Sequence, residues 1–583
     1  MPNVLQEITA MAEIFLAAHK SANSNRRTRR PSAIALAVLA FAMFAVSQSR
    51  VARLDAPGAF AIKDAQIVTS PGKAIAKGTV VFRNGLITEV GANVKIPADA
   101  RVIDGTGMSV YPGLIDGYTN LGVPAPVQQT PTGGGRQAAA AAAAAQPTPP
   151  EARLGDPSIA AADQVKPGAS FEDPRSVGVT AALSSPRQGI FAGQSALINL
   201  AGDEASKIVL RSPVALTVQF SAGAGFGGSY PSSLMGTVSY IRQTFYDALH
   251  YRDEVARYNR VKRGVSRPEY DKRLAALQPA ITGDLPVLFI ANSDGDIRRA
   301  LMIADEFKLK PIIAGALYGY RVADLLKAKG VPVILSVDFP KRPNDLPDDE
   351  DESLRVLRQR TEAPKGAAKL AQAGVKFAFT SGSLRPQDFI ANVQKAVENG
   401  LPKEEALRAL TSNAAEILGA SDQVGTIEVG KIANLVVLSG DLFAKDTKVR
   451  HVFIDGAEVQ LKKAEPARGP GTGGRPVAPT GPAVDPSGNW SLAVQSPQGE
   501  ISVRLALSRD GEQIVGTLDS HMGTFPVKSG RVTGNQIRLS TTVEMNGESV
   551  DVIITGTIEG DSIRGTISMG TMGSFDFTGT RPH

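Results

Sequence analysis

The chain has 583 residues, of which 43% are hydrophobic and 21% charged, as is typical of globular proteins. Its formal net charge of +6 is partly carried by a basic N-terminal segment, and the rest, spread over a long chain, makes no case for nucleic-acid binding. The sequence contains no cysteine, which excludes thiolate catalysis, disulfides and cysteine-ligated zinc.

The N-terminal segment 1–47 has the three parts of a secretory signal peptide. Four arginines (Arg26, Arg27, Arg29 and Arg30) precede an uncharged, mostly apolar run at 33–46, and Ala45-Val46-Ser47 offers small residues for cleavage. The apolar run is shorter than the ~20 residues that span a bilayer comfortably. We therefore expect export to the bacterial periplasm or beyond. The alternative is that the segment stays uncleaved and anchors the protein in the membrane. We expect no membrane attachment other than this one.

Two short strands are predicted next, at 59–68 and within 78–90. Asn84-Gly85 is a strong hairpin signal because both residue types tolerate positive φ. Residues 124–150 then form a low-complexity stretch rich in Gly, Ala and Pro, which we interpret as a surface insertion.

From about residue 161 to 418, apolar runs typical of buried strands alternate with amphipathic helical segments. The strands are predicted at 286–290, 311–314, 331–335 and 375–379, and the helices at 297–307, 320–329 and 386–398. This alternation predicts an α/β fold with parallel strands and right-handed crossovers. Periodicity does not separate an open sheet from a closed barrel, but the length favours a barrel.

The C-terminal part has a different character. Residues 462–485 are rich in Gly, Pro and Ala and are expected to form a linker. In 486–583, short strands recur about every 8–12 residues, separated by turn signals such as Asp510-Gly511 and Asn546-Gly547. This spacing predicts a separate, small antiparallel all-β barrel or sandwich.

Three segments of the chain carry recognisable motifs in a fixed order. The first is 61–121, which includes Pro112-Gly113-Leu114-Ile115-Asp116. The second is 407–418, with Thr411-Ser412-Asn413-Ala414-Ala415. The third is 424–459, with Gly425-Thr426-Ile427-Glu428-Val429-Gly430 and Val452-Phe453-Ile454-Asp455-Gly456. In this order, the three segments resemble the amidohydrolase superfamily and most closely its imidazolonepropionase-like branch.

This resemblance implies a TIM-type (β/α)8 barrel at 114–423, and a small composite β-domain assembled from both flanks of the barrel, 59–113 and 424–460. It also implies a metal-dependent hydrolase of non-peptide C–N bonds. In that family a His-x-His pair ends the first barrel strand, later strands add histidines, and an aspartate follows the last strand. The metal ion lowers the pKa of a bound water and polarises the scissile carbonyl.

The sequence departs from the family at each of these positions. Tyr118-Thr119-Asn120 stands in place of His-x-His, and Ile290, within the later strand Leu288-Phe289-Ile290-Ala291, takes the place of a histidine that precedes a small residue in the family. Ala314-Gly315 follows the next strand without a histidine, and Ser381 stands where the aspartate is expected. We therefore predict no catalytic residue, no metal and no other cofactor, and a ligand pocket lined by Tyr118, Asn120, Ile290 and Ser381.

The five histidines do not replace the missing ligands, because no two of them have a ligand spacing. His250 alone falls within the barrel region, and its helical setting indicates a surface or packing residue. A carboxylate-only site for magnesium or calcium is conceivable at Asp116, at Asp294 and Asp296, or in the acidic run 348–351. These aspartates are more simply read as a structural residue, a helix start and a solvated loop.

Three functional hypotheses follow. The favoured one is an exported, metal-free and catalytically degenerate amidohydrolase relative that binds a small polar ligand or an active amidohydrolase paralogue. The second is an active hydrolase of amide-like C–N bonds, and the third is an envelope scaffold whose C-terminal β-domain makes the contacts. Homo- or hetero-oligomers are compatible with all three hypotheses, and nucleic acid is not an expected partner.

Overall fold

The computed structural model describes residues 59–124, 154–220, 230–231, 233–342, 352–382, 384–461 and 484–581, except for short gaps at 497–498, 511–512, 521–522, 546–547 and 570–573. The predicted leader 1–47, nearly all of the insertion 124–150 and most of the linker 462–485 lie outside these ranges. The turns at Asp510-Gly511 and Asn546-Gly547 also fall partly or wholly outside them.

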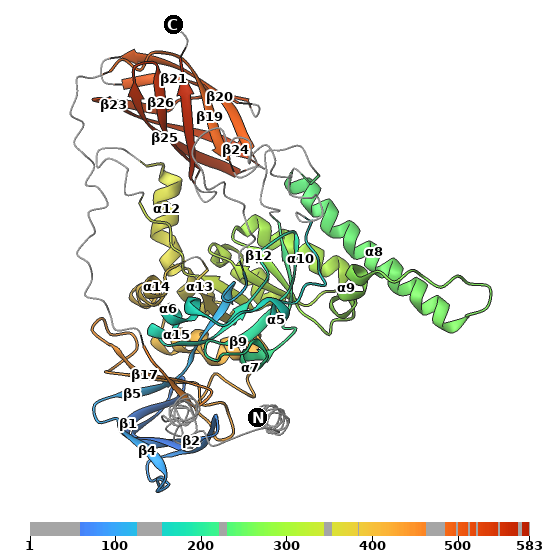
Figure 1. Ribbon diagram of the computed structural model, residues 1–583, viewed down its shortest axis with the longest axis vertical. Helices are drawn as coiled ribbons and strands as arrows, with labels where there is room; N and C mark the ends of the chain where they lie inside the picture. Colours follow the sequence, from blue (N-terminus) through green and yellow to red (C-terminus); the bar gives the residue numbers. More distant parts are fainter. Residues whose placement is uncertain are drawn as a thin grey trace, which may run out of the picture. The chain divides into compact units, whose positions relative to one another are not determined.

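An eight-stranded sheet joins two segments that are far apart in the sequence (Figure 1). β5 pairs antiparallel with β16, so the strand order is β18-β17-β16-β5-β1-β2-β3, with β4 beside β1. The predicted hairpin lies between β2 and β3, where Asn84 and Gly85 have φ values of 50° and 83°. The strands are β1 (Ala59–Ser70), β2 (Lys73–Arg83), β3 (Leu86–Gly91), β4 (Ala100–Asp104), β5 (Ser109–Pro112), β16 (Leu435–Leu438), β17 (Val449–Ile454) and β18 (Ala457–Val459).

Between these flanks, the chain forms a mixed α/β region with two sheets. In one sheet, a parallel ladder joins β6 to β7. In the other, parallel ladders connect β11, β12, β13, β14 and β15 in chain order. β8 and β9 pair antiparallel with β11 and β7, and β10 extends the β9 edge. The strands are β6 (Leu114–Thr119), β7 (Val179–Ser184), β8 (Phe191–Gln194), β9 (Ala196–Asn199), β10 (Val209–Arg211), β11 (Leu216–Gln219), β12 (Val287–Ala291), β13 (Pro311–Gly315), β14 (Val333–Ser336) and β15 (Phe377–Thr380).

Helices follow each of the parallel strands from β11 to β15, as the alternating pattern predicts, and several begin with a side-chain cap. Ser293, for example, accepts a hydrogen bond from the Asp296 amide, which satisfies one of the free N–H groups of the first helical turn. The helices are α5 (Ala161–Gln164), α6 (Glu172–Ser176), α7 (Ala205–Ile208), α8 (Leu234–Arg260), α9 (Lys272–Thr282), α10 (Asp294–Phe307), α11 (Ala323–Ala328), α12 (Leu354–Glu362), α13 (Gly366–Gln372), α14 (Pro386–Glu398), α15 (Lys403–Leu410) and α16 (Ser412–Ile417), with 3-10 turns at Ala169–Phe171, Gly319–Val322 and Ala363–Lys365.

Strand alternation divides the apolar residues of this region into two cores. On β12, Phe289 faces the helices and belongs to one buried cluster, while Leu288 and the partly buried Ile290 belong to the other. The second cluster gathers alternate residues of the parallel strands, such as Leu183, Ile312 and Ile334. No helix within the described residues is long and apolar enough to cross a membrane.

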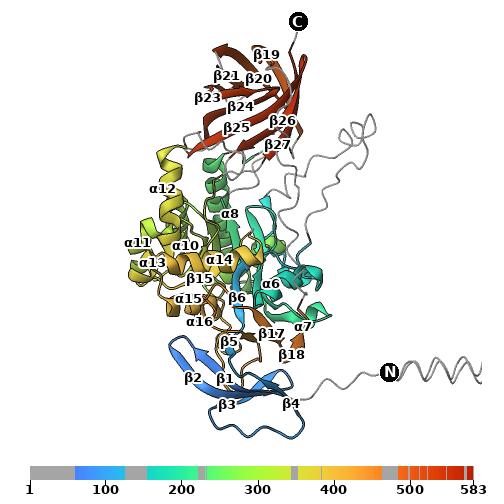
Figure 2. The same cartoon turned by 90° about the vertical axis from the view of Figure 1, so that its left-hand side faces the viewer.

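The C-terminal strands form a closed antiparallel β-barrel, which decides between the two predicted alternatives of barrel and sandwich (Figure 2). The ring is closed by pairing of β20 with β21, and β22 pairs with β21 outside it. Apolar residues at alternate positions, Trp490 and Leu505 among them, fill the interior. The strands are β19 (Gly488–Ser496), β20 (Gly499–Asp510), β21 (Gln513–Ser520), β22 (Gly523–Pro526), β23 (Ser529–Thr533), β24 (Gln536–Met545), β25 (Glu548–Glu559), β26 (Ser562–Met569) and β27 (Ser574–Thr580).

Candidate functional site

The end of β6 carries the three residues that stand in place of His-x-His, and two of these side chains are already engaged in hydrogen bonds. Thr119 Oγ1 donates to the carbonyl of Leu183 at 3.1 Å, and Asn120 Nδ2 donates to the carbonyl of Ser185 at 3.0 Å. Arg187 donates to the backbone carbonyl of Asn120 at 3.3 Å. These bonds attach the end of β6 to the end of β7.

Asp116 lies in the middle of this group and is 3% exposed. Its Oδ1 accepts hydrogen bonds from the backbone amides of Ser381, at 3.1 Å, and Tyr118, at 3.4 Å. Burial raises the pKa of Asp116 to about 6, against the lowering effect of the hydrogen bonds from Ser381. The carboxyl group therefore links β6 to the end of β15, and it titrates near neutral pH.

The four residues predicted to line a ligand pocket are brought into one region, but in two settings. Ser381 reaches Asp116 through its backbone amide, and Asn120 binds the end of β7. Tyr118 and Ile290 are partly buried and pack against the same apolar cluster between the parallel strands. Burial raises the pKa of Tyr118 to about 12, so its phenol is neutral at physiological pH.

Sequence reasoning missed a pair of buried hydroxyls beside Asn120. Ser185 Oγ and Thr217 Oγ1 lie 2.8 Å apart, and both residues are 0% exposed. Ser185 directly follows β7 and Thr217 lies within β11, and no ladder connects these two strands directly. The one available signal was the polar Ser184-Ser185 dipeptide directly after the apolar run of β7.

We expect Ser185→Ala to lower the free energy of unfolding by about 1–3 kcal/mol, because it leaves the buried Thr217 hydroxyl without its partner. The double variant Ser185→Ala/Thr217→Val removes both polar groups and should recover most of this loss. Urea unfolding of the two single variants and the double variant measures the coupling. Strictly additive losses would show that the two hydroxyls do not interact.

The donors at these strand ends do not fit the divalent ion that the family resemblance implies. Asp116 supplies one carboxyl group, whereas the neighbouring donors are neutral hydroxyl and carboxamide groups, which are poor ligands for zinc. In the part of the chain that the structure describes, no three His, Cys, Asp or Glu side chains gather in a group that could hold a metal ion.

The histidines lie elsewhere. His250 is an exposed residue of α8, 3.4 Å from Glu254, which confirms its interpretation as a surface residue. His451 belongs to β17 and lies 2.7 Å from Glu458. His19, His521 and His583 fall outside the described residues. Asp294 and Asp296 occupy the first turn of α10, the helix start that the sequence indicated, and Arg299 pairs with Asp296.

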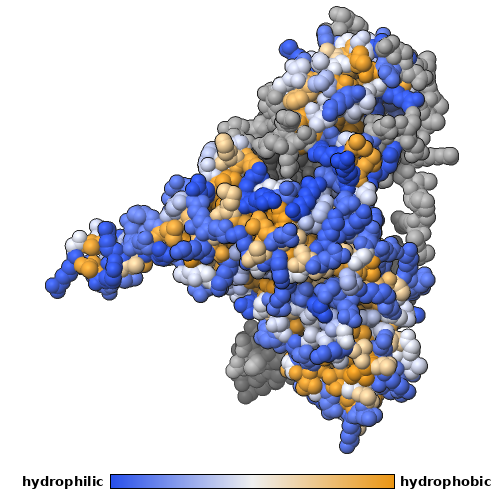
Figure 3. Space-filling model, turned by 180° about the vertical axis from the view of Figure 1, so that it is seen from behind, coloured by the Kyte–Doolittle hydropathy of each residue, from blue (hydrophilic) through white to orange (hydrophobic). Residues whose placement is uncertain are grey.

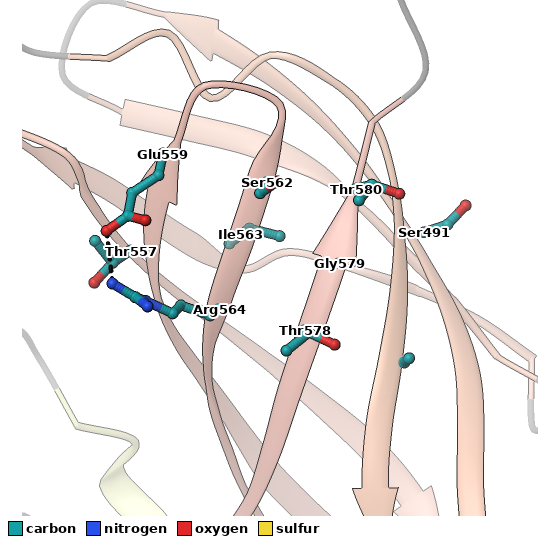
Figure 4. A pocket seen from close by; sticks show the side chains of 10 residues that line it. Ser491, Thr557, Glu559, Ser562, Ile563, Arg564, Thr578, Gly579 and Thr580 are labelled. Carbon is teal, nitrogen blue, oxygen red and sulfur yellow. Dashed lines mark hydrogen bonds and ion pairs between the residues drawn. The ribbon is translucent and has the colours of Figure 1, made fainter. Parts of the chain in front are cut away.

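A second candidate site is a shallow hollow of about 430 Å³ on the C-terminal barrel (Figure 4). Serine and threonine side chains from β19, β25, β26 and β27 line it, together with an ion pair between Glu559 and Arg564 at 2.7 Å. Figure 4 shows these hydroxyls along the outer faces of neighbouring strands. The hollow therefore offers hydrogen-bonding groups and one ion pair, whose two charges sum to zero.

Comparison with known proteins relates 69% of this chain to one family of structures. A model of the amidohydrolase family matches residues 320–459. An amidohydrolase from Thermotoga maritima MSB8 aligns over 69% of this chain and all of its own length, with 26% sequence identity and a TM-score of 0.58. Adenine deaminase from Moorella thermoacetica is 26% identical over 201 residues, which are 32% of this chain and 28% of the deaminase. This chain is a member of the amidohydrolase superfamily.

Proposed function

We propose that this protein is an exported amidohydrolase relative that binds a small polar ligand at the strand ends around Tyr118, Asn120 and Ser381, without a metal and without hydrolysis. The observation that carries the proposal is the donor set at the end of β6. Two neutral side chains, Tyr118 and Asn120, stand in place of the family's imidazole ligands, and Thr119 and Asn120 donate to backbone carbonyls at the end of β7. Their chemistry suits hydrogen bonding to a neutral solute better than activation of water.

The proposal assumes that the two sheets of the α/β region form one (β/α)8-type barrel. Contacts across their edges support this assumption. The Ser381 amide binds Asp116 across the β15–β6 edge, and the Ser185–Thr217 hydroxyl pair bridges β7 and β11. In such a barrel the carboxyl ends of the strands form the functional face. The proposal also includes three features predicted from the sequence: the domain limits, the export signal and the absence of cofactors.

Metal analysis of the purified full chain tests the first half of the proposal. We expect no stoichiometric zinc, nickel, iron or manganese after expression in metal-supplemented medium, and no hydrolysis of amide, ureido or aminopurine compounds, because the strand ends lack imidazole ligands. One equivalent of a transition metal that is lost in an Asp116→Asn variant would contradict the proposal and favour the active-hydrolase hypothesis.

Thermal shift measurements with a panel of small amides, ureas and cyclic imides test the second half. A ligand at 100 times its Kd stabilises the folded state by about 2.7 kcal/mol. We expect such a shift for the wild-type chain and its loss in Asn120→Leu, which removes a donor and an acceptor at the end of β6. Met302→Leu, at an exposed position of α10, is the matched control.

The hydroxyl-lined hollow of the C-terminal barrel favours a second candidate, an envelope scaffold. Its serine and threonine groups face outward on four strands, where a polymer with many hydroxyl groups has room to lie (Figure 4). The test is binding of cell-envelope polysaccharide to the full chain. Binding that Arg564→Gln weakens and Asn120→Leu leaves unchanged would assign the contacts to this barrel. Co-purification of an intact amidohydrolase would support the paralogue as the partner instead.

A further inference from the structure

Helix α8 has two halves with different surroundings. Its buried residues, Thr237, Ile241, Phe245 and Ala248, all lie between Leu234 and Ala248, where the helix packs into the core of the α/β region. From Leu249 to Ala276, a stretch that includes the rest of α8 and the start of α9, no residue is buried. Figure 1 shows the distal half of α8 and the following loop leading away from the strands as an arm.

The end of this arm is strongly basic. The tip of the arm, residues 255–270, contains five basic residues and one acidic residue, Glu269, although the low overall net charge gives no hint of this basic excess. All five side chains are exposed, and none has an ion pair or side-chain hydrogen bond within the described residues: Arg257, Arg260, Lys262, Arg263 and Arg267. Glu254, which lines the same hollow as Arg257 and Arg267, already faces His250.

Exposed apolar side chains accompany these cations. Val261 is 55% exposed and stands between Arg260 and Lys262, and Tyr270 is 73% exposed just beyond the basic stretch. Figure 3 shows the arm from behind, with small hydrophobic patches among predominantly hydrophilic residues. An aliphatic side chain framed by Lys and Arg, with a nearby tyrosine, is the combination found where proteins enter the headgroup region of a membrane.

We propose that the tip of this arm, residues 255–270, docks on the surface of an anionic lipid bilayer. The unpaired cations supply attraction to the headgroups, and Val261 and Tyr270 supply the shallow apolar contact. A membrane surface accommodates the end of a protruding arm, whereas nucleic-acid binders present an extended basic surface that follows the phosphate backbone. The inference is independent of the ligand site proposed at the ends of the parallel strands.

Vesicle sedimentation tests the charge contribution. The full chain is mixed with phosphatidylglycerol/phosphatidylcholine vesicles or with pure phosphatidylcholine vesicles. We compare the tip variant R257Q/R260Q/K262Q/R263Q/R267Q with a control that removes five exposed cations elsewhere, K73Q/K95Q/K166Q/R298Q/R358Q. The tip variant should bind anionic vesicles more than about 100-fold more weakly than the control, because each basic residue near such a surface contributes about five-fold.

A single label tests the location of the contact and separates it from any contribution of the leader. Because the chain has no cysteine, Val261→Cys provides one attachment point for an environment-sensitive fluorophore, and Met302→Cys on α10 provides an exposed control. The label at 261 should shift to the blue and brighten on addition of anionic vesicles, and half-molar salt should reverse the change. The label at 302 should not respond.

Three outcomes would overturn the proposal. These are equal sedimentation of the tip and control variants, equal binding to phosphatidylcholine vesicles, or an unchanged label at 261 in protein that sediments. Tighter binding of the tip to duplex DNA than to anionic vesicles at the same salt concentration would assign the cations to nucleic acid instead. Matching circular dichroism of the two five-site variants shows that a difference between them does not come from misfolding.

Discussion

Asp116→Asn is expected to stabilise the protein at pH 7 by as much as about 3 kcal/mol. The pKa of Asp116 is about 6 in the folded chain, against an ordinary value of 3.8, and each unit corresponds to about 1.36 kcal/mol. Because the folded state holds this proton more tightly, the contribution of Asp116 to stability is fully present below pH 3.8. It is lost as the pH rises through about 6.

The side-chain amide of the Asp116→Asn variant can keep the hydrogen bonds that the carboxyl group of Asp116 accepts. Both the Ser381 and the Tyr118 amides donate to Oδ1, and the carbonyl oxygen of an asparagine accepts the same two bonds. The variant should therefore match the wild type in urea unfolding below pH 3.8, become progressively more stable than the wild type as the pH rises from 3.8 to about 6, and keep a constant advantage at higher pH. Asp422→Asn, at an exposed position without a hydrogen bond or ion pair among the described residues, is the control and should show no such divergence.

The opposite result has a specific meaning. If Asp116→Asn unfolds more easily than the wild type at pH 7.5, the ionised carboxylate contributes a favourable interaction. A bound cation or a cationic ligand group is the simplest source of such an interaction, since the groups facing Asp116 in the structure are backbone amides and hydroxyls. That outcome would contradict the metal-free proposal as well.

Local patterns made much of the fold predictable. The Asn84-Gly85 turn predicts the β2–β3 hairpin because the residue types themselves allow positive φ. The helix predicted at 386–398 coincides with α14, since Pro386 begins it and its apolar side chains, such as Phe389 and Val393, recur with helical spacing. The composite β-domain and the barrel were predicted from the resemblance to the family motifs, because the hydrophobic periodicity of the chain does not indicate either of them.

Other features depend on long-range pairing and could not be predicted. The antiparallel strands β8 and β9 are short runs around Gly193, and their pairing with β11 and β7 is fixed by tertiary contacts. Closure of the C-terminal barrel likewise rests on the register between β20 and β21, which strand spacing does not encode. At the site, the sequence singled out Tyr118 and Asn120 through their departure from a motif, while Ser185 and Thr217 belong to no motif.

We expect Leu539→Ala to destabilise the C-terminal barrel by about 2–5 kcal/mol, because Leu539 is 1% exposed in the barrel interior and its truncation leaves a cavity. The barrel contains Trp490, the only tryptophan of the chain, which is itself buried in the same cluster. Tryptophan fluorescence therefore reports the unfolding of this barrel, whereas helical circular dichroism reports the α/β region, where the described helices lie.

Leu288→Ala is the matched variant, because Leu288 is 0% exposed in the cluster between the parallel strands. If the proposed domain limits are correct, Leu539→Ala shifts the denaturant midpoint measured by fluorescence and leaves the midpoint measured by circular dichroism in place. Leu288→Ala should do the reverse. Coincident shifts of both midpoints in both variants would show that the barrel and the α/β region unfold as one cooperative unit, since cavities in independent units do not affect each other's transitions. In that case the segment before residue 486 would act as part of a single structure and not as a linker.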